Sequence, residues 1–221
     1  MRLKMPTPLH GWRAFAGEVG IIVIGVLIAL AAQQLVEDFH WRRDVEIMRR
    51  SLSGELANDR ARWEANMSFL PCASREIAAL DRWAADDQAN APAPPAPVTF
   101  RSLFWWMHSA NWNLAMSSGT LDHFSIPDQL AFATLYDGIA HREVDIESAS
   151  DLIQKAAGLV PLASDREGRR ELRVVLGTLA GKIEGLAIND DYMRRHFDAL
   201  GVKPNRSDIA ADDATIPQCP S

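Results

Sequence analysis

The N-terminal part of the chain carries an uninterrupted apolar stretch, from Val19 to Val36, without a charged side chain. As a helix these residues would span about 27 Å, close to the roughly 30 Å of hydrocarbon in a bilayer. Trp12 and Trp41 flank the stretch, and indole rings favour the two interfaces of a membrane. The pattern predicts a transmembrane helix over residues 18–36, with these two tryptophans at the membrane borders.

Two other interpretations of this stretch stay open. Residues 21–30 are compatible with the apolar region of a secretory signal peptide, because Ala29-Leu30-Ala31 is similar to a small-residue cleavage site. The stretch is also compatible with a core helix of a soluble domain. We favour a retained anchor, because helical patterning continues past the cleavage site and a core helix at a terminus seldom lacks polar positions.

Beyond the span, apolar residues recur mostly every three, four or seven positions, with charged residues of both signs between them. This is the periodicity of amphipathic helices. No segment shows convincing strand alternation, so the predicted fold is all-α. The predicted organisation is a short cytoplasmic N-terminus (1–17), the transmembrane helix (18–36), an amphipathic stalk helix (37–70), a small helical-bundle domain (71–201) that opens at Pro71 and contains a proline-rich connector (88–97), and an irregular, extended tail (202–221).

The predicted helical domain contains two capping motifs and one helix with large apolar residues on one face and glycines on the opposite face. Ser125 and Ser164 each open a capping box, with an acidic residue three positions later. The helix after Ser164 has a stripe of large apolar residues and, opposite it, the small residues Gly177, Gly181 and Gly185. Because glycine weakens a helix, we expect these glycines to meet a closely approaching backbone at a helix–helix interface; tolerance of glycine on a solvent face is the alternative.

The span has small and polar residues on one face. Gly25 and Ala29 form a small-xxx-small pair, and Gln33 follows at the same spacing. Such a face lets two helices approach closely and hydrogen-bond in a membrane. The expected partners are therefore the lipid bilayer and either another membrane protein or a second copy of this chain.

Charge changes the picture of possible partners. The chain has 23 Lys and Arg against 29 Asp and Glu, a net charge of −6. Residues 1–36 carry a net charge of +2, so the remaining body carries −8. Because nucleic-acid binding requires clustered basic residues to displace counterions, an acidic body excludes nucleic acid as a partner.

The two cysteines, Cys72 and Cys219, bear on orientation. Basic residues are almost equally frequent on both sides of the span, so the positive-inside rule decides little. A pair with one cysteine in the helical body and one in the tail suits a disulfide, which requires an oxidising compartment; two unrelated thiols are the alternative. We predict a cytoplasmic N-terminus and a periplasmic body at an inner membrane.

No pattern for catalysis is present in the sequence. The six histidines are scattered without metal-ligand spacing, and neither a nucleophile elbow nor a phosphate loop occurs. We therefore expect no catalytic residue, no metal site and no cofactor, and we predict that the protein is not an enzyme. An aromatic cluster around Trp105 and Trp106 is compatible with a ligand site, but core packing explains it better.

Several short motifs carry a resemblance across most of the chain. They are the residues Phe15–Leu30 of the span, Pro71-Cys72 with Leu80, Trp112 with Ala115 and Ser118-Gly119-Thr120-Leu121, Leu135-Tyr136, and the late Cys219. With this layout the chain resembles uncharacterised bacterial proteins that have one N-terminal span and a helical extracytoplasmic domain of unknown function. The resemblance implies no known activity, and it supports the pairing of Cys72 with Cys219.

Two functions are compatible with these sequence features. The first is a membrane-anchored interaction or accessory protein, a small non-catalytic subunit of a larger inner-membrane complex or a homo-oligomer. The alternative is an extracytoplasmic ligand-sensing domain that uses the aromatic cluster around Trp105 and acts through a separate signalling partner.

Overall fold

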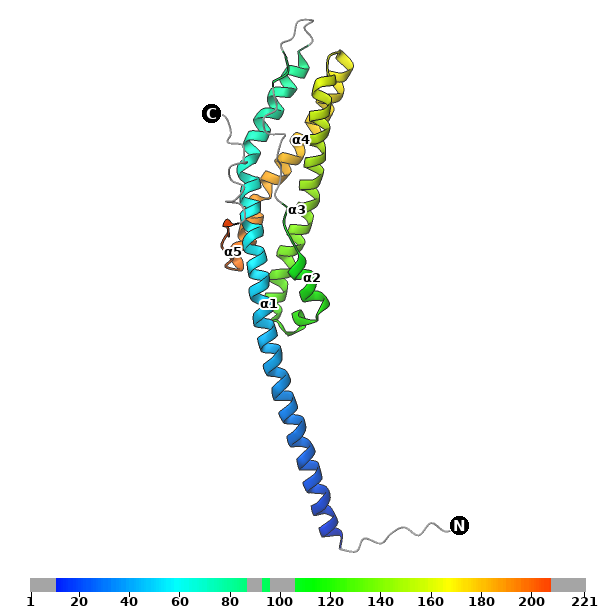
Figure 1. Ribbon diagram of the computed structural model, residues 1–221, viewed down its shortest axis with the longest axis vertical. Coiled ribbons are helices and arrows are strands. Elements are labelled where there is room, and N and C mark those ends of the chain that lie inside the picture. Colours follow the sequence, from blue (N-terminus) through cyan, green and yellow to red (C-terminus); the bar gives the residue numbers. More distant parts are fainter. Residues whose placement is uncertain (1–10, 87–92, 96–105, 208–221) are drawn as a thin grey trace, which may run out of the picture. The chain divides into compact units, whose positions relative to one another are not determined.

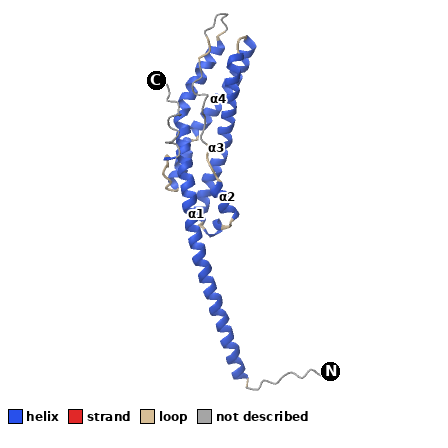
Figure 2. Ribbon diagram, in the orientation of Figure 1, coloured by secondary structure: helices blue, strands red, loops and turns tan. Residues whose placement is uncertain are grey.

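The structure is a computed structural model, and it describes residues 11–86, 93–95 and 106–207. Within these residues the chain is all-α, as predicted, and Figure 2 shows helices and loops without a strand. The helices are α1 (Trp12–Ala85), α2 (Ala110–Ser117), α3 (Ile126–Leu159), α4 (Arg166–Ile188) and α5 (Asp190–Ala199), with short 3-10 helices η1 (Thr120–His123) and η2 (Val160–Leu162). The chain divides into two compact units, Met1–Ile47 and Met48–Ser221.

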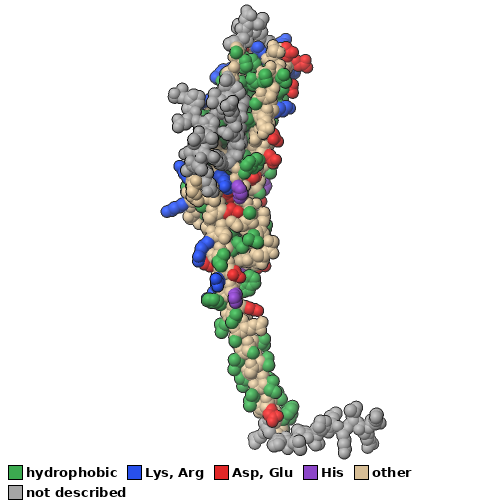
Figure 3. All heavy atoms as spheres, in the orientation of Figure 1, with side chains coloured by type: hydrophobic (Ala, Val, Ile, Leu, Met, Phe, Trp, Pro, Cys, Tyr) green, Lys and Arg blue, Asp and Glu red, His purple; other side chains and the backbone are tan. Residues whose placement is uncertain are grey.

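The first unit contains the apolar part of α1. Its large side chains are solvent-exposed: Ile21 by 74%, for example, and Ile28 by 65%. Figure 3 shows hydrophobic side chains covering this part of the helix. One helix among the described residues is long and apolar enough to cross a membrane, and its most apolar window has no buried residue. A core helix of a soluble domain would instead bury that window against the rest of the protein.

α1 also passes through Pro71 without ending, so the predicted boundary between a stalk helix and a second helix at this residue is wrong. α1 is a single helix of 74 residues with Pro71 inside it. Proline has no N–H and costs a helix interior about 3 kcal/mol. The flanking residues Leu70 and Cys72 are 4% and 3% exposed. Their burial favours continuation of the helix and offsets the local cost of proline.

The core of the second unit lies between α3, α4 and the part of α1 after Ile47. Figure 1 shows α3 and α4 side by side, joined by η2. The large apolar stripe predicted for α4 is buried throughout: Leu172, Val175, Leu176, Leu179, Ile183 and Leu186. From α1, Leu52, Leu56 and Trp63 are fully buried. Burial of one fully enclosed leucine contributes about 1.5–3 kcal/mol, so this stripe is a main source of stability.

The helix starts follow from local capping, with one correction. Ser125 caps α3 as predicted, because its side chain accepts a hydrogen bond from the Asp128 N–H. The cap of α4 is Asp165 and not Ser164, and its side chain accepts from the Gly168 N–H at 2.8 Å. Both serine and aspartate side chains accept hydrogen bonds from the free N–H groups at a helix start, so the capping box predicted the start of α4 to within one residue.

Candidate functional site

A fully buried carboxylate, Asp59, lies in the middle of α1 and is 0% exposed. Its Oδ1 atom accepts hydrogen bonds from the His108 backbone N–H at 2.9 Å and from Arg62 Nη1 at 3.1 Å. Its Oδ2 atom has no hydrogen-bond partner in the described part of the chain. A buried carboxylate oxygen without a partner is costly, because nothing replaces the water it has lost. Asp59 is therefore a costly polar group in the core of the second unit.

Like Asp59, two further carboxylates accept hydrogen bonds from backbone N–H groups of residues 106–111. Glu55 of α1 accepts from the Asn111 N–H at 2.9 Å, and Glu143 of α3 accepts from the Met107 N–H at 2.5 Å. Residues 106–111, which we call the entry segment, comprise the chain just before α2 and the first two residues of that helix. The entry segment is thus fixed at three backbone N–H groups by three carboxylates from two helices.

One of these carboxylates, Glu55, replaces local capping at the start of α2. The N-cap residue Ser109 makes no side-chain capping bond. The first N–H groups of a helix need acceptors from elsewhere, and negative charge is favourable at this end of the helix dipole. Glu55 supplies one such acceptor to Asn111, from a position 56 residues earlier in the chain. The position of α2 therefore depends on tertiary contacts.

Burial changes the proton affinity of this carboxylate cluster. Loss of hydration raises the pKa of Asp59 from 3.8 to about 7, although the His108 N–H and Arg62 oppose the rise. Burial likewise raises the pKa of Glu143 above its ordinary value. The pKa of Tyr136 is also raised, first by burial and then by its hydrogen bond to Glu55, whose Oε1 lies 2.7 Å from the hydroxyl. At neutral pH, Asp59 is thus close to half protonated.

Arg62 joins Asp59 to His108. Arg62 Nη1 lies 2.7 Å from His108 Nδ1 and 3.1 Å from Asp59 Oδ1. Since a guanidinium only donates, Nδ1 must be the acceptor, and this contact requires a neutral imidazole with its proton on Nε2. The cluster can hold and release a proton. Among residues 11–86, 93–95 and 106–207, no group of three His, Cys, Asp or Glu side chains is arranged to hold a metal ion.

The aromatic residues near the entry segment are divided between core and surface. The ring of Trp112 stacks on Tyr136, with centroids 4.9 Å apart and planes inclined by 13°. Trp106 is 49% exposed. Trp105 lies outside the described residues. The stacking of Trp112 favours the core-packing interpretation for that ring, because one of its faces is already covered.

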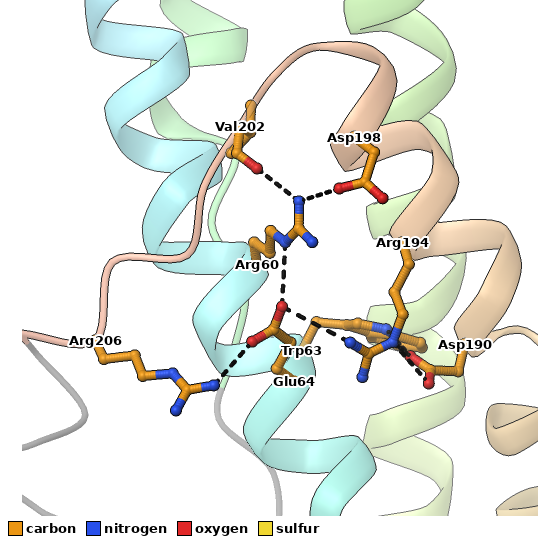
Figure 4. A network of polar contacts seen from close by, with 8 residues as sticks. All are labelled: Arg60, Trp63, Glu64, Asp190, Arg194, Asp198, Val202 and Arg206. Carbon is orange, nitrogen blue, oxygen red and sulfur yellow. Dashed lines mark hydrogen bonds and ion pairs between the residues drawn. The ribbon is translucent and has the colours of Figure 1, made fainter.

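A second polar network, the α5 clamp (Arg60, Trp63, Glu64, Asp190, Arg194, Asp198, Val202 and Arg206), joins α1 to the C-terminal part of the described chain (Figure 4). Arg60 Nη1 donates to Asp198 Oδ1 at 2.5 Å and to the Val202 carbonyl at 2.7 Å. Arg60 Nε donates to Glu64 Oε1 at 3.1 Å. The side chain of Arg60, only 14% exposed, thus binds the last turn of α5 and the Val202 carbonyl after it.

Glu64 is the centre of the α5 clamp. It accepts from Arg206 Nη2 at 3.1 Å and lies 3.8 Å from Arg194 Nη1. Arg194 also binds Asp190, which accepts a hydrogen bond from Trp63 Nε1 at 2.9 Å. Charge-assisted hydrogen bonds of half-buried groups are among the stronger polar contacts in proteins. The clamp therefore holds residues 202–207 and α5 against α1.

The predicted interface residues of the span lie on the exposed surface of α1. A Cβ atom added at Gly25 would meet nothing within 4 Å in the described chain. Ala29 is exposed, and the Gln33 amide donates to Glu37 one turn later, at 3.4 Å. This face is available for the predicted helix–helix contact, which stays a prediction.

The glycine face of α4 (Gly177, Gly181 and Gly185) is open. A Cβ atom added at any of the three would meet nothing within 4 Å in the described chain. The apolar residues Val174 and Ile188, at the two ends of this face, are 67% and 72% exposed. The closely approaching backbone that we expected is not provided by the described residues, where the glycines lie on a solvent-exposed face as the alternative has it. The helix–helix interface at these glycines stays a prediction.

The remaining predicted residues are placed as follows. Cys72 is buried on α1, with its Sγ atom 4.0 Å from Arg75 Nη2. Cys219 lies outside the described residues, so the predicted disulfide stays a prediction. Trp12 is 78% exposed, with its ring centroid 6.1 Å from that of Phe15, and Trp41 is half-buried.

The carboxylate cluster was not predicted from the sequence, although α1 carries a signal for it. Charged residues of both signs between the apolar positions after the span indicate, by sequence alone, a solvated helix face. Asp59, however, falls on the buried stripe formed by Leu52, Leu56 and Trp63, at steps of four, three and four residues. An ionisable residue on an apolar stripe must find partners inside the fold. That break in the pattern marks the site.

The comparisons with known proteins leave the family undetermined. No protein-family model matches the chain, and neither does a curated protein or a solved structure. The resemblance to bacterial single-span proteins with a helical extracytoplasmic domain therefore stays a prediction. Any functional proposal must rest on the geometry of the described residues.

Proposed function

We propose that this protein is a membrane-anchored interaction or accessory protein, a small non-catalytic subunit of a larger inner-membrane complex or a homo-oligomer. The observation that carries the proposal is the open glycine face of α4. Three glycines in the interior of one helix destabilise it by about 1 kcal/mol each relative to alanine. No packing within the described chain compensates for that cost. A partner helix that approaches the backbone closely would compensate for it.

The two ends of the glycine face support a protein partner. Val174 and Ile188 are large apolar residues that remain mostly exposed. Apolar anchors on either side of a flat, small-residue surface suit an approaching helix, because the anchors bury area while the glycines permit close contact. Gly25 and Ala29 offer a similar surface on the apolar part of α1.

We propose a single span with the N-terminus in the cytoplasm and the body in the periplasm. The exposed apolar surface of α1 supports membrane insertion, since a water-soluble helix with this surface would aggregate. The presence of only two cysteines, one of them buried on α1, supports an oxidising compartment for the body. Cleavage after residue 31 would instead identify a signal peptide, and N-terminal sequencing of the mature protein distinguishes the two.

Affinity purification from native membranes in a mild detergent tests the proposal. We expect a second polypeptide, or a second copy of this chain, to co-purify with the wild-type protein. Gly181→Leu should abolish the association, because a large side chain on the glycine face blocks close approach. Gly54→Leu is the matched control, since Gly54 is also an exposed helical glycine, and a Cβ atom added there would meet nothing within 4 Å among the described residues. A monomer without a partner, or equal loss with both variants, would contradict the proposal.

A further inference from the structure

The entry segment (residues 106–111) is fastened in an unusual way. The Met107 N–H donates a hydrogen bond to Glu143, the His108 N–H donates to Asp59, and the Asn111 N–H donates to Glu55. Backbone donors bound to carboxylates are strong when the carboxylate is charged. Of the three carboxylates, Asp59 alone is completely buried and, within the described part of the chain, retains an oxygen without a partner. Ionisation of Asp59 therefore has two opposite effects on the stability of the hydrogen-bonded entry segment.

The ionised form of Asp59 strengthens the bonds of Oδ1 but leaves a charge on the unpartnered Oδ2. Water can reach Oδ2 only when the chain that covers Asp59 moves. The His108 N–H binds Asp59 directly, so displacement of the entry segment uncovers the carboxylate. A protonated Asp59 carries no charge to hydrate, which makes the covered state less costly.

We propose that the entry segment is a pH-responsive latch, closed over Asp59 when the carboxyl group is protonated and released from α1 when the carboxyl group ionises. This proposal concerns the conformation of the second unit and is independent of the function proposed above. Release of the latch would uncover Met107, which is 5% exposed in the closed state, next to Trp106. The latch would thus change the apolar surface that the body presents to a partner.

The charged and titratable groups around Asp59 favour release of the entry segment when Asp59 ionises. From α1, Glu55 adds negative charge and Arg62 adds positive charge; the entry segment contributes His108. From α3, Tyr136 is uncharged and bound to Glu55, and Glu143 is bound to the entry segment. The guanidinium of Arg62 is shared between Asp59 and His108. It does not compensate fully for burial, and the pKa of Asp59 stays raised to about 7.

Hydrogen exchange of the full-length protein in detergent tests the latch. The protection factors of the Met107 and His108 amides, corrected for intrinsic exchange, are measured from pH 5 to pH 8.5. Opening that releases one proton changes its equilibrium by at most about tenfold per pH unit. We expect protection to fall with that limiting slope below about pH 7 and to level off above it. The α4 amides should stay more strongly protected than those of Met107 and His108 at every pH, which distinguishes release of the latch from global unfolding.

Two variants assign the effect to Asp59. Asp59→Asn retains an oxygen that accepts from the His108 N–H, and should remove the pH dependence of protection. Glu55→Gln is the matched control: it weakens the fastening of Asn111 but should retain the pH dependence, with a lower midpoint, because a negative neighbour of Asp59 is removed. Uniform protection of the wild-type segment from pH 5 to pH 8.5 would overturn the proposal. Persistence of the pH dependence in Asp59→Asn would overturn it too. The wild-type series and the Glu55→Gln midpoint decide the matter if Asp59→Asn fails to fold.

Discussion

Replacement of Gly177, Gly181 and Gly185 by alanine should stabilise the isolated protein. A Cβ atom at each position meets nothing within 4 Å among the described residues, so the substitutions introduce no clash there. Each replacement removes the excess backbone freedom of glycine from the unfolded chain, a gain of about 0.5–1 kcal/mol. The three positions lie four residues apart on an exposed face, and their contributions should add to about 1.5–3 kcal/mol. For a chain of this size, that gain corresponds to an increase in Tm of roughly 3–12 °C.

Thermal unfolding of the purified monomer in detergent, followed by circular dichroism, measures this gain. Gly168→Ala provides the contrast, because a Cβ atom there would lie 3.0 Å from the Leu162 carbonyl oxygen and 3.1 Å from Ala163 Cα. That substitution should lower Tm. If the triple variant has an unchanged or lower Tm, the glycine face is covered within the chain and the reasoning is refuted. If Tm rises as expected, the native glycines make the isolated protein less stable than alanines would, and binding of a partner to this face would explain their presence.

The other predictions concern charge and sulfur. Because the pKa of Asp59 is about 7 in the folded state and 3.8 in the unfolded state, the free energy of unfolding should fall as pH rises between these values, by on the order of 4 kcal/mol in total. Denaturant titration at several pH values measures this fall, and an equally steep fall with pH in Asp59→Asn would contradict the prediction. Glu64→Ala, which removes the centre of the α5 clamp, should lower the free energy of unfolding by about 1–3 kcal/mol, while Glu171→Ala, at an exposed position, should change it by less than about 0.5 kcal/mol. In acid-quenched cells, Cys72 and Cys219 should react with a thiol reagent only after reduction, and full labelling without reductant would exclude the disulfide.

The helix α4 was predictable from sequence because its local and tertiary requirements agree. A capping residue marks its start, and Leu172 to Leu186 repeat at helical spacing. The same periodicity that forms the amphipathic helix also builds the core, so the buried face follows from the pattern. Only the exact cap differed, since adjacent Ser164 and Asp165 are both good capping residues.

Two features of α1 were not predictable in the same way. Pro71 is a local signal for a helix boundary, but the burial of its neighbours Leu70 and Cys72 favours continuation of the helix. The role of Asp59 depends on His108, which is 49 residues away in sequence and belongs to no regular pattern. Contacts of that kind are set by tertiary packing and leave little trace in periodicity.

Site-specific photo-crosslinking in intact cells tests most directly whether α4 binds a partner. A photo-reactive amino acid at Thr178, which is exposed beside Gly177, is compared with the same amino acid at Thr134, an exposed threonine of α3. We predict a discrete crosslinked product from Thr178, formed with another membrane protein or a second copy of this chain, and none from Thr134. Absence of a product at Thr178, or equal products at both positions, would contradict a partner on the glycine face.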